Sequence, residues 1–208
     1  MGIDEGLIKQ VTEVSPLSPK LLVKSEREST SAPAGEVPTA ANLPPPLMHG
    51  NDWHGQDVSG WWCSEKFQGL RAYWTGQWLL SPEGHDYRAP AWFVSGLPVF
   101  PLDCELWLGR GPGGEAVRRA IAAGEWERLK LVVFDIPDMM VEGAIATLRK
   151  LTLKPPAIVA DHWQVGTTSG AKAAMRHIVA NGGEGVVLRK PHSRYRAKRT
   201  SDLLKLKP

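Results

Sequence analysis

Residues 129–136 read LKLVVFDI, a nearly continuous apolar run with the length of one β-strand. Such a run is typical of a strand that is covered on both faces, so we expect it near the centre of a sheet. After it, a helix is predicted from about 139 to 151, which must end before Pro155 and Pro156. Before it, apolar residues at helical spacing predict a helix over 114–123. The centre of the chain therefore mixes strands and helices.

The flanking segments extend this pattern with short strands and two further helices. Strands are predicted over 61–65, 70–74, 78–81, 102–108, 158–165, 185–189 and 203–207, and helices over 91–96 and 169–181. Ser169 can cap the last helix, and Gly182 with Gly183 can end it in a left-handed conformation. The sequence therefore predicts an α+β fold.

Composition divides the chain into two regions. Residues 1–52 contain seven of the 17 prolines, none of the 16 aromatic residues, four basic residues and seven acidic residues. Such a stretch cannot bury enough apolar surface to offset its ordering entropy. We therefore expect residues 1–46 to be a disordered tail or linker. Residues 47–208, which hold all nine tryptophans, are expected to form one domain.

The sequence also argues against several classes of protein. No apolar run approaches the roughly 18–20 residues of a membrane span, and the N-terminus lacks the basic and apolar pattern of a signal peptide. These observations favour a cytoplasmic protein without a membrane partner. Cys63 and Cys104 are too few for a disulfide framework or a four-cysteine metal site, so we expect two reduced core or pocket residues.

Basic residues concentrate at the C-terminal end. Residues 172–208 contain ten Lys and Arg residues against two acidic residues. This surplus predicts a face that binds phosphates, and a solvated lysine-rich tail is the alternative. Within it, the stretch LLKLK (203–207) alternates apolar and basic residues, which would direct Lys205 and Lys207 to one face of a strand.

One lysine is distinguished by an ordered series of motifs. Lys66 lies in SEKFQGLR (64–71), between a predicted strand and a glycine that lets the backbone pass close to a ligand. This motif alone is a weak signal. It gains weight because four others follow it in order, namely LDCELW (102–107), VFDIP (133–137), EGVVLR (184–189) and LKLK (204–207).

These motifs resemble the covalent nucleotidyltransferase superfamily, and specifically the adenylation domain of small bacterial or phage ATP-dependent DNA ligases. The resemblance extends from about Pro44 to Pro208 and includes WWCSEK, LRAYW, RAPAWFVSGLP, LDCELW, FDIP, GGEGVVLRKP and LLKLKP. It implies an α+β, ATP-grasp-like nucleotidyltransferase fold, in which antiparallel sheets are flanked by helices and the nucleotide lies in the groove between them. It also implies ATP and Mg²⁺ as cofactors, and nicked duplex DNA as the partner of a monomeric enzyme.

The resemblance assigns the phosphate chemistry to four residues. Lys66 would attack the α-phosphate of ATP, Glu184 would serve the metal and the phosphates, and Lys205 and Lys207 would hold the α-phosphate. A lysine amine is protonated at neutral pH and is then a poor nucleophile, so neighbouring positive charges that favour its neutral form support this role. The same charges would stabilise the phosphoryl oxygens as pyrophosphate leaves.

The resemblance places four further residues at the nucleotide. Glu105 would contact the ribose, Phe134 would stack on adenine, Glu65 would help to bind the nucleotide, and Arg71 would reach the ribose or a nucleic-acid phosphate. Taken alone, Phe134 fits a core position better than an adenine platform, and the ordered motifs reverse that preference. Asp135 is interpreted as a structural residue that can cap the next helix.

The sequence departs from the family at several points. The first motif is usually K-x-D-G, whereas Gln68 supplies no carboxylate, and Cys104 replaces the glycine of L-D-G-E. SPEG (81–84) stands where S-R-N-G is common, so a basic residue that would touch nucleotide or DNA is absent. These departures predict impaired activity.

Family members continue after the last motif into an OB-fold domain that wraps DNA, whereas this sequence ends at Pro208. We therefore expect the OB-fold domain to be absent from the chain, either through truncation or because a partner supplies it. Three alternatives to a DNA ligase stay open at this point. One is an inactive homologue that binds nicked DNA or nucleotide. The other two, an RNA ligase and an RNA-capping guanylyltransferase, are less favoured by the LRAYW and RAPAWF segments.

Overall fold

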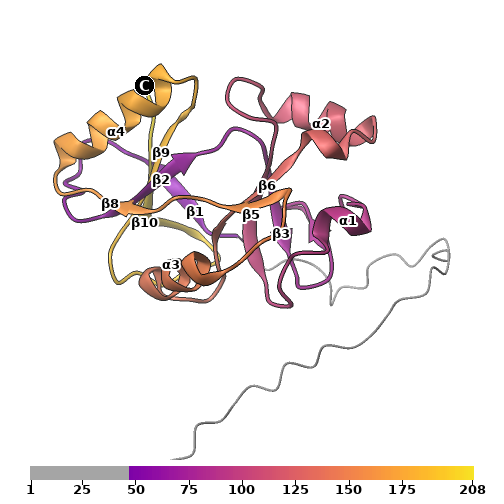
Figure 1. Cartoon of the computed structure of the whole chain (residues 1–208). Helices are drawn as coiled ribbons and strands as arrows, with labels where there is room; N and C mark the ends of the chain where they lie inside the picture. The colour runs from indigo at the N-terminus through magenta and orange to yellow at the C-terminus, as the bar shows by residue number, and fades with distance from the viewer. Residues whose placement is uncertain (1–46) are drawn as a thin grey trace, which may run out of the picture. The chain divides into compact units, whose positions relative to one another are not determined.

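The computed structural model describes residues 47–208, so the predicted disordered tail, residues 1–46, lies outside the described residues. Two five-stranded sheets form the framework of the described part. Figure 1 shows helix α4 (Thr168–Ala180) beside one sheet, and helices α1 (Ala91–Val94) and α2 (Gly114–Ala122) beside the other. The predicted α+β fold is confirmed.

The first sheet carries the lysine motif. Its strand order is β1 (His49–Asp52), β10 (Arg199–Leu206), β9 (Gly185–Arg189), β2 (Trp62–Lys66) and β8 (Trp163–Gln164). Leu188 and Leu204 are buried in a core with Ile178 of α4, so this helix covers one face of the sheet. Because side chains alternate along a strand, Val187 and Lys205 face the opposite side.

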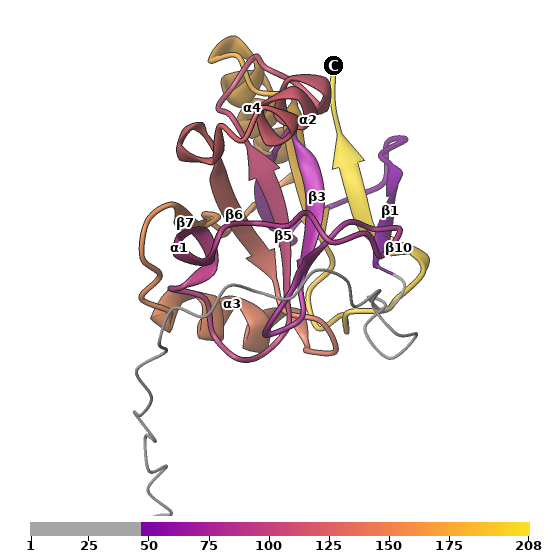
Figure 2. The same ribbon diagram turned by 90° about the vertical axis from the view of Figure 1, so that its right-hand side faces the viewer.

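The second sheet contains the apolar run 129–136. Its order is β4 (Leu79–Leu80), β3 (Leu70–Trp74), β5 (Leu102–Trp107), β6 (Lys130–Asp135) and β7 (Ala157–Val159). Strand β6 lies between β5 and β7, and Leu131, Val132 and Val133 are each 0% exposed. Figure 2 shows β3, β5 and β6 side by side in this sheet. The prediction of an interior strand covered on both faces is confirmed.

Helix α3 (Val141–Lys150) and the other three helices fall within two residues of the predicted bounds, and a 3₁₀ helix (Trp126–Arg128) precedes β6. Gly182 follows α4 with a φ of +82°, as a left-handed helix stop requires. The cap of α4 was assigned to the wrong residue. Thr167 is the N-terminal cap residue, because its Oγ1 accepts a hydrogen bond from the Gly170 amide at 3.1 Å, and Ser169 lies inside the first turn. None of the helices within 47–208 is long and apolar enough to cross a membrane.

The sheets differ from the expectation in three details. Each is mixed, because β1 pairs in parallel with β10 and β6 pairs in parallel with β7, while the other pairs are antiparallel. The predicted strand 158–165 is two strands in different sheets. The Ala160 amide bonds to Val133 O on β6, whereas the Val165 amide bonds to Trp61 O next to β2, so the chain crosses between the sheets there. Strand β1 was not predicted, since its sequence HGND has no apolar alternation.

Candidate functional site

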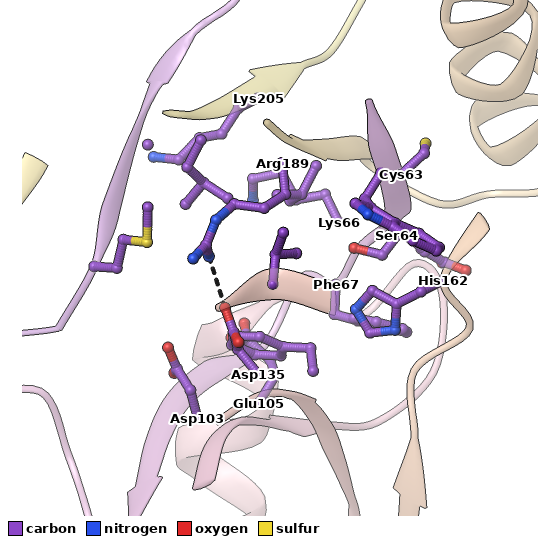
Figure 3. A pocket seen from close by; sticks show the side chains of 18 of the residues that line it. Cys63, Ser64, Lys66, Phe67, Asp103, Glu105, Asp135, His162, Arg189 and Lys205 are labelled. Atoms are coloured by element: carbon purple, nitrogen blue, oxygen red, sulfur yellow. Dashed lines mark hydrogen bonds and ion pairs between the residues drawn. The ribbon is translucent and has the colours of Figure 1, made fainter. Parts of the chain in front are cut away.

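Both sheets line a cavity of about 250 Å³. Figure 3 shows side chains entering it from strands of each sheet. The charged and aromatic lining residues of the first sheet include Lys66, Arg189 and Lys205, and those of the second include Arg71, Asp103, Glu105, Phe134 and Asp135. Segments that are far apart in the sequence therefore meet at one site.

Lys66 ends strand β2 at the edge of this cavity. Its Nζ lies 2.6 Å from Oε2 of Glu184, and the two side chains are 22% and 23% exposed. The register of β2 against β9 pairs Lys66 with Gly185, which brings the preceding Glu184 alongside the amine. Gly185 has a φ of +155°, and a Cβ there would lie 2.3 Å from Leu206 O. The glycine of the E-G pair is therefore needed for β9 to start this close to β10.

Glu105 holds the loop that follows the lysine. Its Oε1 accepts a hydrogen bond from the Gly69 amide at 2.8 Å, and a Cβ at Gly69 would lie only 2.0 Å from Leu106 O. Burial raises the pKa of Glu105 to about 7, although the Gly69 amide and the positive charges of Lys66 and Arg71 oppose the shift. Glu105 therefore combines a positioning contact with an unusually basic carboxylate in the cavity wall.

Arg71 is held by Asp103 on the neighbouring strand. The Arg71 Nε lies 3.0 Å from Asp103 Oδ1, and Nη2 lies 2.6 Å from Oδ2. Tyr195 donates its hydroxyl to the same carboxylate at 2.8 Å, and the Arg71 guanidinium lies 5.9 Å from the Phe134 ring centroid. Asp103 was not identified as a site residue from the sequence. The one feature that could have indicated it is its place two residues before Glu105 in LDCE, which puts both side chains on one face of a strand.

Asp135 bonds across the cavity. Its Oδ2 accepts from Arg189 Nη1 at 2.7 Å, as the dashed line in Figure 3 shows, and Arg189 Nε donates to Ser193 Oγ at 2.9 Å. Burial raises the pKa of Asp135 to about 6, and the charge of Arg189 opposes the shift. The interpretation of Asp135 as a helix cap is wrong, since Met140 is the N-terminal cap residue of α3. Within residues 47–208, Arg189 Nη2 has no hydrogen-bond partner.

The predicted site residues meet this cavity to different extents. Six of them line it, namely Glu65, Lys66, Arg71, Glu105, Phe134 and Lys205. Glu184 is not a lining residue but contacts Lys66, whereas Lys207 follows β10, is exposed and does not line the cavity. Glu65 directs its carboxylate to Arg110, at 2.9 and 2.7 Å, so this carboxylate is occupied by an ion pair. Burial and the charge of Lys66 lower the pKa of Lys205.

Two of the unusual residues lie outside the cavity. Gln68 is exposed, and its Nε2 lies 3.4 Å from the place that a Cβ of Gly113 would occupy, against the start of α2. Cys104 is 0% exposed in the apolar core of the second sheet. Both cysteines are free, and burial raises the pKa of Cys63 to about 12 and that of Cys104 well above its usual value. Both cysteines are buried, as expected for core or pocket residues.

The donor set tests whether a metal ion fits. The described residues contain no group of three or more His, Cys, Asp or Glu side chains that could hold a metal by themselves. Mg²⁺ bound with nucleotides usually takes only one or two carboxylates and fills its other positions with phosphate oxygens and water. The single carboxylate of Glu184 beside Lys66 fits this way of binding Mg²⁺, in which phosphates and water supply most of the ligands.

Comparisons with known proteins show what this chain is similar to. No protein-family profile matches the chain. A DNA ligase of Haemophilus influenzae is 34% identical over 170 residues, which cover 77% of this chain and 63% of the relative. The chain therefore spans less than two thirds of that relative.

Solved ligase structures share the fold. A structure from a study of Lig E DNA ligases superposes with a TM-score of 0.70 at 24% identity, over 78% of this chain and 68% of that one. The DNA ligase-adenylate of Chlorella virus gives 0.64 at 18% identity, over 77% and 66%. The ATP-dependent DNA ligase of bacteriophage T7, in complex with ATP, gives 0.59 at 14% identity, over 80% and 70%.

The two-sheet fold matches that of the nucleotidyltransferase domain of DNA ligases. Within that fold, the chain resembles the adenylation domain of ATP-dependent DNA ligases, and its sequence is similar to that of a DNA ligase over 77% of its length. The resemblance expected from the ordered motifs is confirmed.

Proposed function

We propose that this chain catalyses the adenylylation chemistry of an ATP-dependent DNA ligase. Lys66 would take AMP from ATP and pass it to the 5′-phosphate of nicked DNA. The observation that carries the proposal is the 2.6 Å contact between Lys66 Nζ and Glu184, at the edge of a cavity that Phe134 and Glu105 also line.

The cavity can orient ATP along its length. Phe134 offers a ring that can stack on the base, next to the guanidinium of Arg71. Glu105 offers a carboxylate that can accept hydrogen bonds from ribose hydroxyls. Lys205, which lines the cavity with Lys66, supplies positive charge for the α-phosphate. Base, sugar and phosphate would then lie in the order that directs the α-phosphorus to Lys66.

The first chemical step forms one bond and breaks one. Lys66 Nζ loses a proton and attacks the α-phosphorus, the bond to the bridging oxygen of the β-phosphate breaks, and pyrophosphate leaves. The Glu184 carboxylate is the hydrogen-bond acceptor within reach of the amine, so it can hold the nitrogen in line and accept its proton. When bound, Mg²⁺ would add charge neutralisation at the phosphates, with Glu184 as its protein ligand.

Transfer to DNA requires a surface that accepts a phosphate backbone. Between β9 and β10, four basic side chains are exposed, namely Lys190, Arg194, Arg196 and Lys198. A 5′-phosphate oxygen would attack the lysyl-AMP phosphorus and release the Lys66 amine, and a 3′-hydroxyl would then displace AMP to close the nick. Such nick sealing would serve DNA replication, repair or recombination.

The proposal is tested by intact mass spectrometry after incubation of the full chain with ATP and Mg²⁺. We expect a mass increase of one AMP that maps by peptide analysis to Lys66 and is absent from Lys66→Ala. Lys150→Ala, which removes an exposed lysine at the end of α3 and outside the cavity, is the matched control and should be adenylylated normally. An adduct that persists in Lys66→Ala contradicts the assignment.

A binding protein without chemistry is the second candidate. The exchange of the usual first-motif carboxylate for Gln68 is the feature that favours it, although Gln68 itself does not line the cavity. ATP binding by calorimetry with no covalent adduct would support this candidate.

Nick sealing would also need contacts from an OB-fold domain, supplied by the same polypeptide or by a partner. A monomeric state and a cytoplasmic location, where ATP and DNA are both present, are part of the proposal.

A further inference from the structure

Strand β1 organises positive charge at the cavity. The carbonyl oxygen of Met48 accepts a hydrogen bond from Arg71 Nη2 at 2.8 Å, and the carbonyl oxygen of Gly50 accepts one from Arg199 Nη1 at 2.8 Å. The residue between these two carbonyls is His49. Backbone atoms on either side of this histidine therefore orient two guanidinium groups.

His49 belongs to both the cavity and the solvent-exposed surface. It lines the cavity together with Lys205 and Arg71, and it is exposed. Its amide donates to Lys198 O at 3.1 Å, and the parallel register of β1 against β10 pairs it with Arg199. These backbone contacts hold His49 beside the basic segment 190–198, which leads into β10.

Positive charge dominates the surroundings of His49. The groups that act on it are Arg71 of β3, Arg199 and Lys205 of β10, and Asp103 of β5. Burial and the three cations lower the pKa of His49, and Asp103 alone opposes them. The Asp103 carboxylate is already bonded to Arg71 and Tyr195. Three cations act on His49 against one engaged carboxylate, and Asp52 adds one further negative charge beside Lys205. The site therefore keeps a net positive charge that a phosphate group would complement.

We propose that His49, Arg199 and Lys205 form a phosphate-binding subsite at the mouth of the cavity, in which His49 is a positioning residue that donates a hydrogen bond to a phosphate oxygen. The inference rests on the proposed function, because it places the subsite beside the reacting lysine. The ligand chemistry is a phosphate group with two negative charges, which either the triphosphate of ATP or the 5′-phosphate of a nick can supply.

Proton uptake is the expected signature of this subsite. A phosphate dianion placed among these cations reverses the field on His49, so the imidazole should gain a proton as the ligand binds. The pKa of His49 should therefore rise on binding, and phosphate affinity should increase as the pH falls towards 6. A histidine with a purely structural role would show neither effect.

The test follows the imidazole protons of His49 by NMR in the full chain across a pH series. One arm adds inorganic pyrophosphate, and the other compares nicked duplex DNA that carries a 5′-phosphate with the same duplex that carries a 5′-hydroxyl. We expect the pKa of His49 to rise with pyrophosphate, with the 5′-phosphate, or with both, and not with the 5′-hydroxyl duplex. The arm that responds identifies the source of the phosphate.

Variants separate a positioning role from a structural one. His49→Ala should weaken phosphate binding about three- to tenfold. His49→Gln, which keeps a donor but cannot be protonated, should retain more affinity and lose the pH dependence. The control is His54→Ala, since His54 is exposed, lies five residues further along and does not line the cavity.

Two results would overturn the inference: a pKa of His49 that neither ligand moves, or His49→Ala binding both ligands as tightly as the unmodified chain. Lysyl-AMP formation is measured in the same preparations. If Lys66 is not adenylylated but the His49 response is present, the proposed function fails and the subsite stands. If Lys66 is adenylylated but His49 does not respond, the subsite fails alone.

Discussion

Arg189 of β9 and Asp135 of β6 join the two sheets by an ion pair of 2.7 Å, with side chains that are only 8% and 14% exposed. The first sheet supplies the arginine and the second supplies the carboxylate. Because the pair lies on the wall of the cavity, the same contact that shapes the site also holds the two halves of the domain together.

Asp135→Asn should destabilise the domain by about 3 kcal/mol, because it leaves the charge of Arg189 buried without its partner. The corresponding fall in Tm is about 6 to 12 °C for a domain of this size, measured by calorimetry at pH 7. Asp138→Asn is the control, since Asp138 is exposed and asparagine tolerates its φ of +63°. Equal Tm values for the two variants would show that the ion pair contributes little.

Glu105 should make stability depend on pH. Its pKa is about 7 in the folded chain against an ordinary value of 4.5, so the folded state binds more protons than the unfolded state between these values. The contribution is present below pH 4.5 and is lost as the pH rises to about 7, by roughly 1 to 3 kcal/mol. Glu105→Gln keeps the acceptor for Gly69 and should flatten the fall in unfolding free energy, measured by urea denaturation. If the unfolding free energy falls equally with pH in Glu105→Gln and in the unmodified chain, Glu105 is not the group that titrates.

DNA binding should weaken steeply with salt. Each phosphate contact releases counterions, so the slope of log affinity against log salt should become shallower by about 0.9 for each contact that is removed. Arg194→Gln, Arg196→Gln and Lys198→Gln should each show this change in fluorescence anisotropy with a nicked duplex. Lys130→Gln removes an exposed charge from β6 and should leave the slope unchanged. A flat salt dependence of the unmodified chain would rule out a phosphate-binding face.

Gln68→Glu should stabilise the domain slightly and change adenylylation little. The Gln68 side chain lies against the start of α2, where a negative charge interacts favourably with the helix dipole, by about 0.5 kcal/mol. The gain should disappear below pH 4, where the new carboxylate is protonated. Because Gln68 does not line the cavity, the rate of lysyl-AMP formation should stay within about threefold, which corresponds to less than 1 kcal/mol. A large rise in the rate of lysyl-AMP formation would indicate that a first-motif carboxylate does act on the nucleotide.

The N-terminal boundary can be tested by two deletions. Removal of residues 1–45 should leave the Tm and ATP binding unchanged, as expected for a stretch without aromatic residues. Removal of residues 1–52 should abolish ATP binding, because it deletes β1 and the carbonyl partners of Arg71 and Arg199. A loss of several degrees in the shorter deletion would mean that the tail packs on the domain.

The sequence predicted the parts of the site that depend on local order along the chain. Lys66, Glu105 and Phe134 were identified because five motifs follow one another in a fixed order. Strand β6 was identified because its apolar run is long. Asp103, Asp135 and His49 were not assigned to the site, since their roles arise from strands that meet only after folding. Strand β1 was missed for a related reason: its polar residues pair through the backbone with β10, and backbone pairing leaves no periodic signal.

Glu65 and Arg110 form a second link between the halves of the domain, and it differs from the pair of Arg189 and Asp135 in how far water reaches it. The arginine side chain of this outer pair is 34% exposed, and Glu65 lies near the Lys66 end of β2, three residues, or roughly 10 Å, from Trp62, the β2 residue that pairs with Arg189. Dissolved ions screen the outer pair strongly and the inner pair weakly. Raising the ionic strength should therefore weaken the pair at the Lys66 end of β2 before it weakens the pair of Arg189 and Asp135, so that the rate of nucleotide exchange responds to salt before the folded state does.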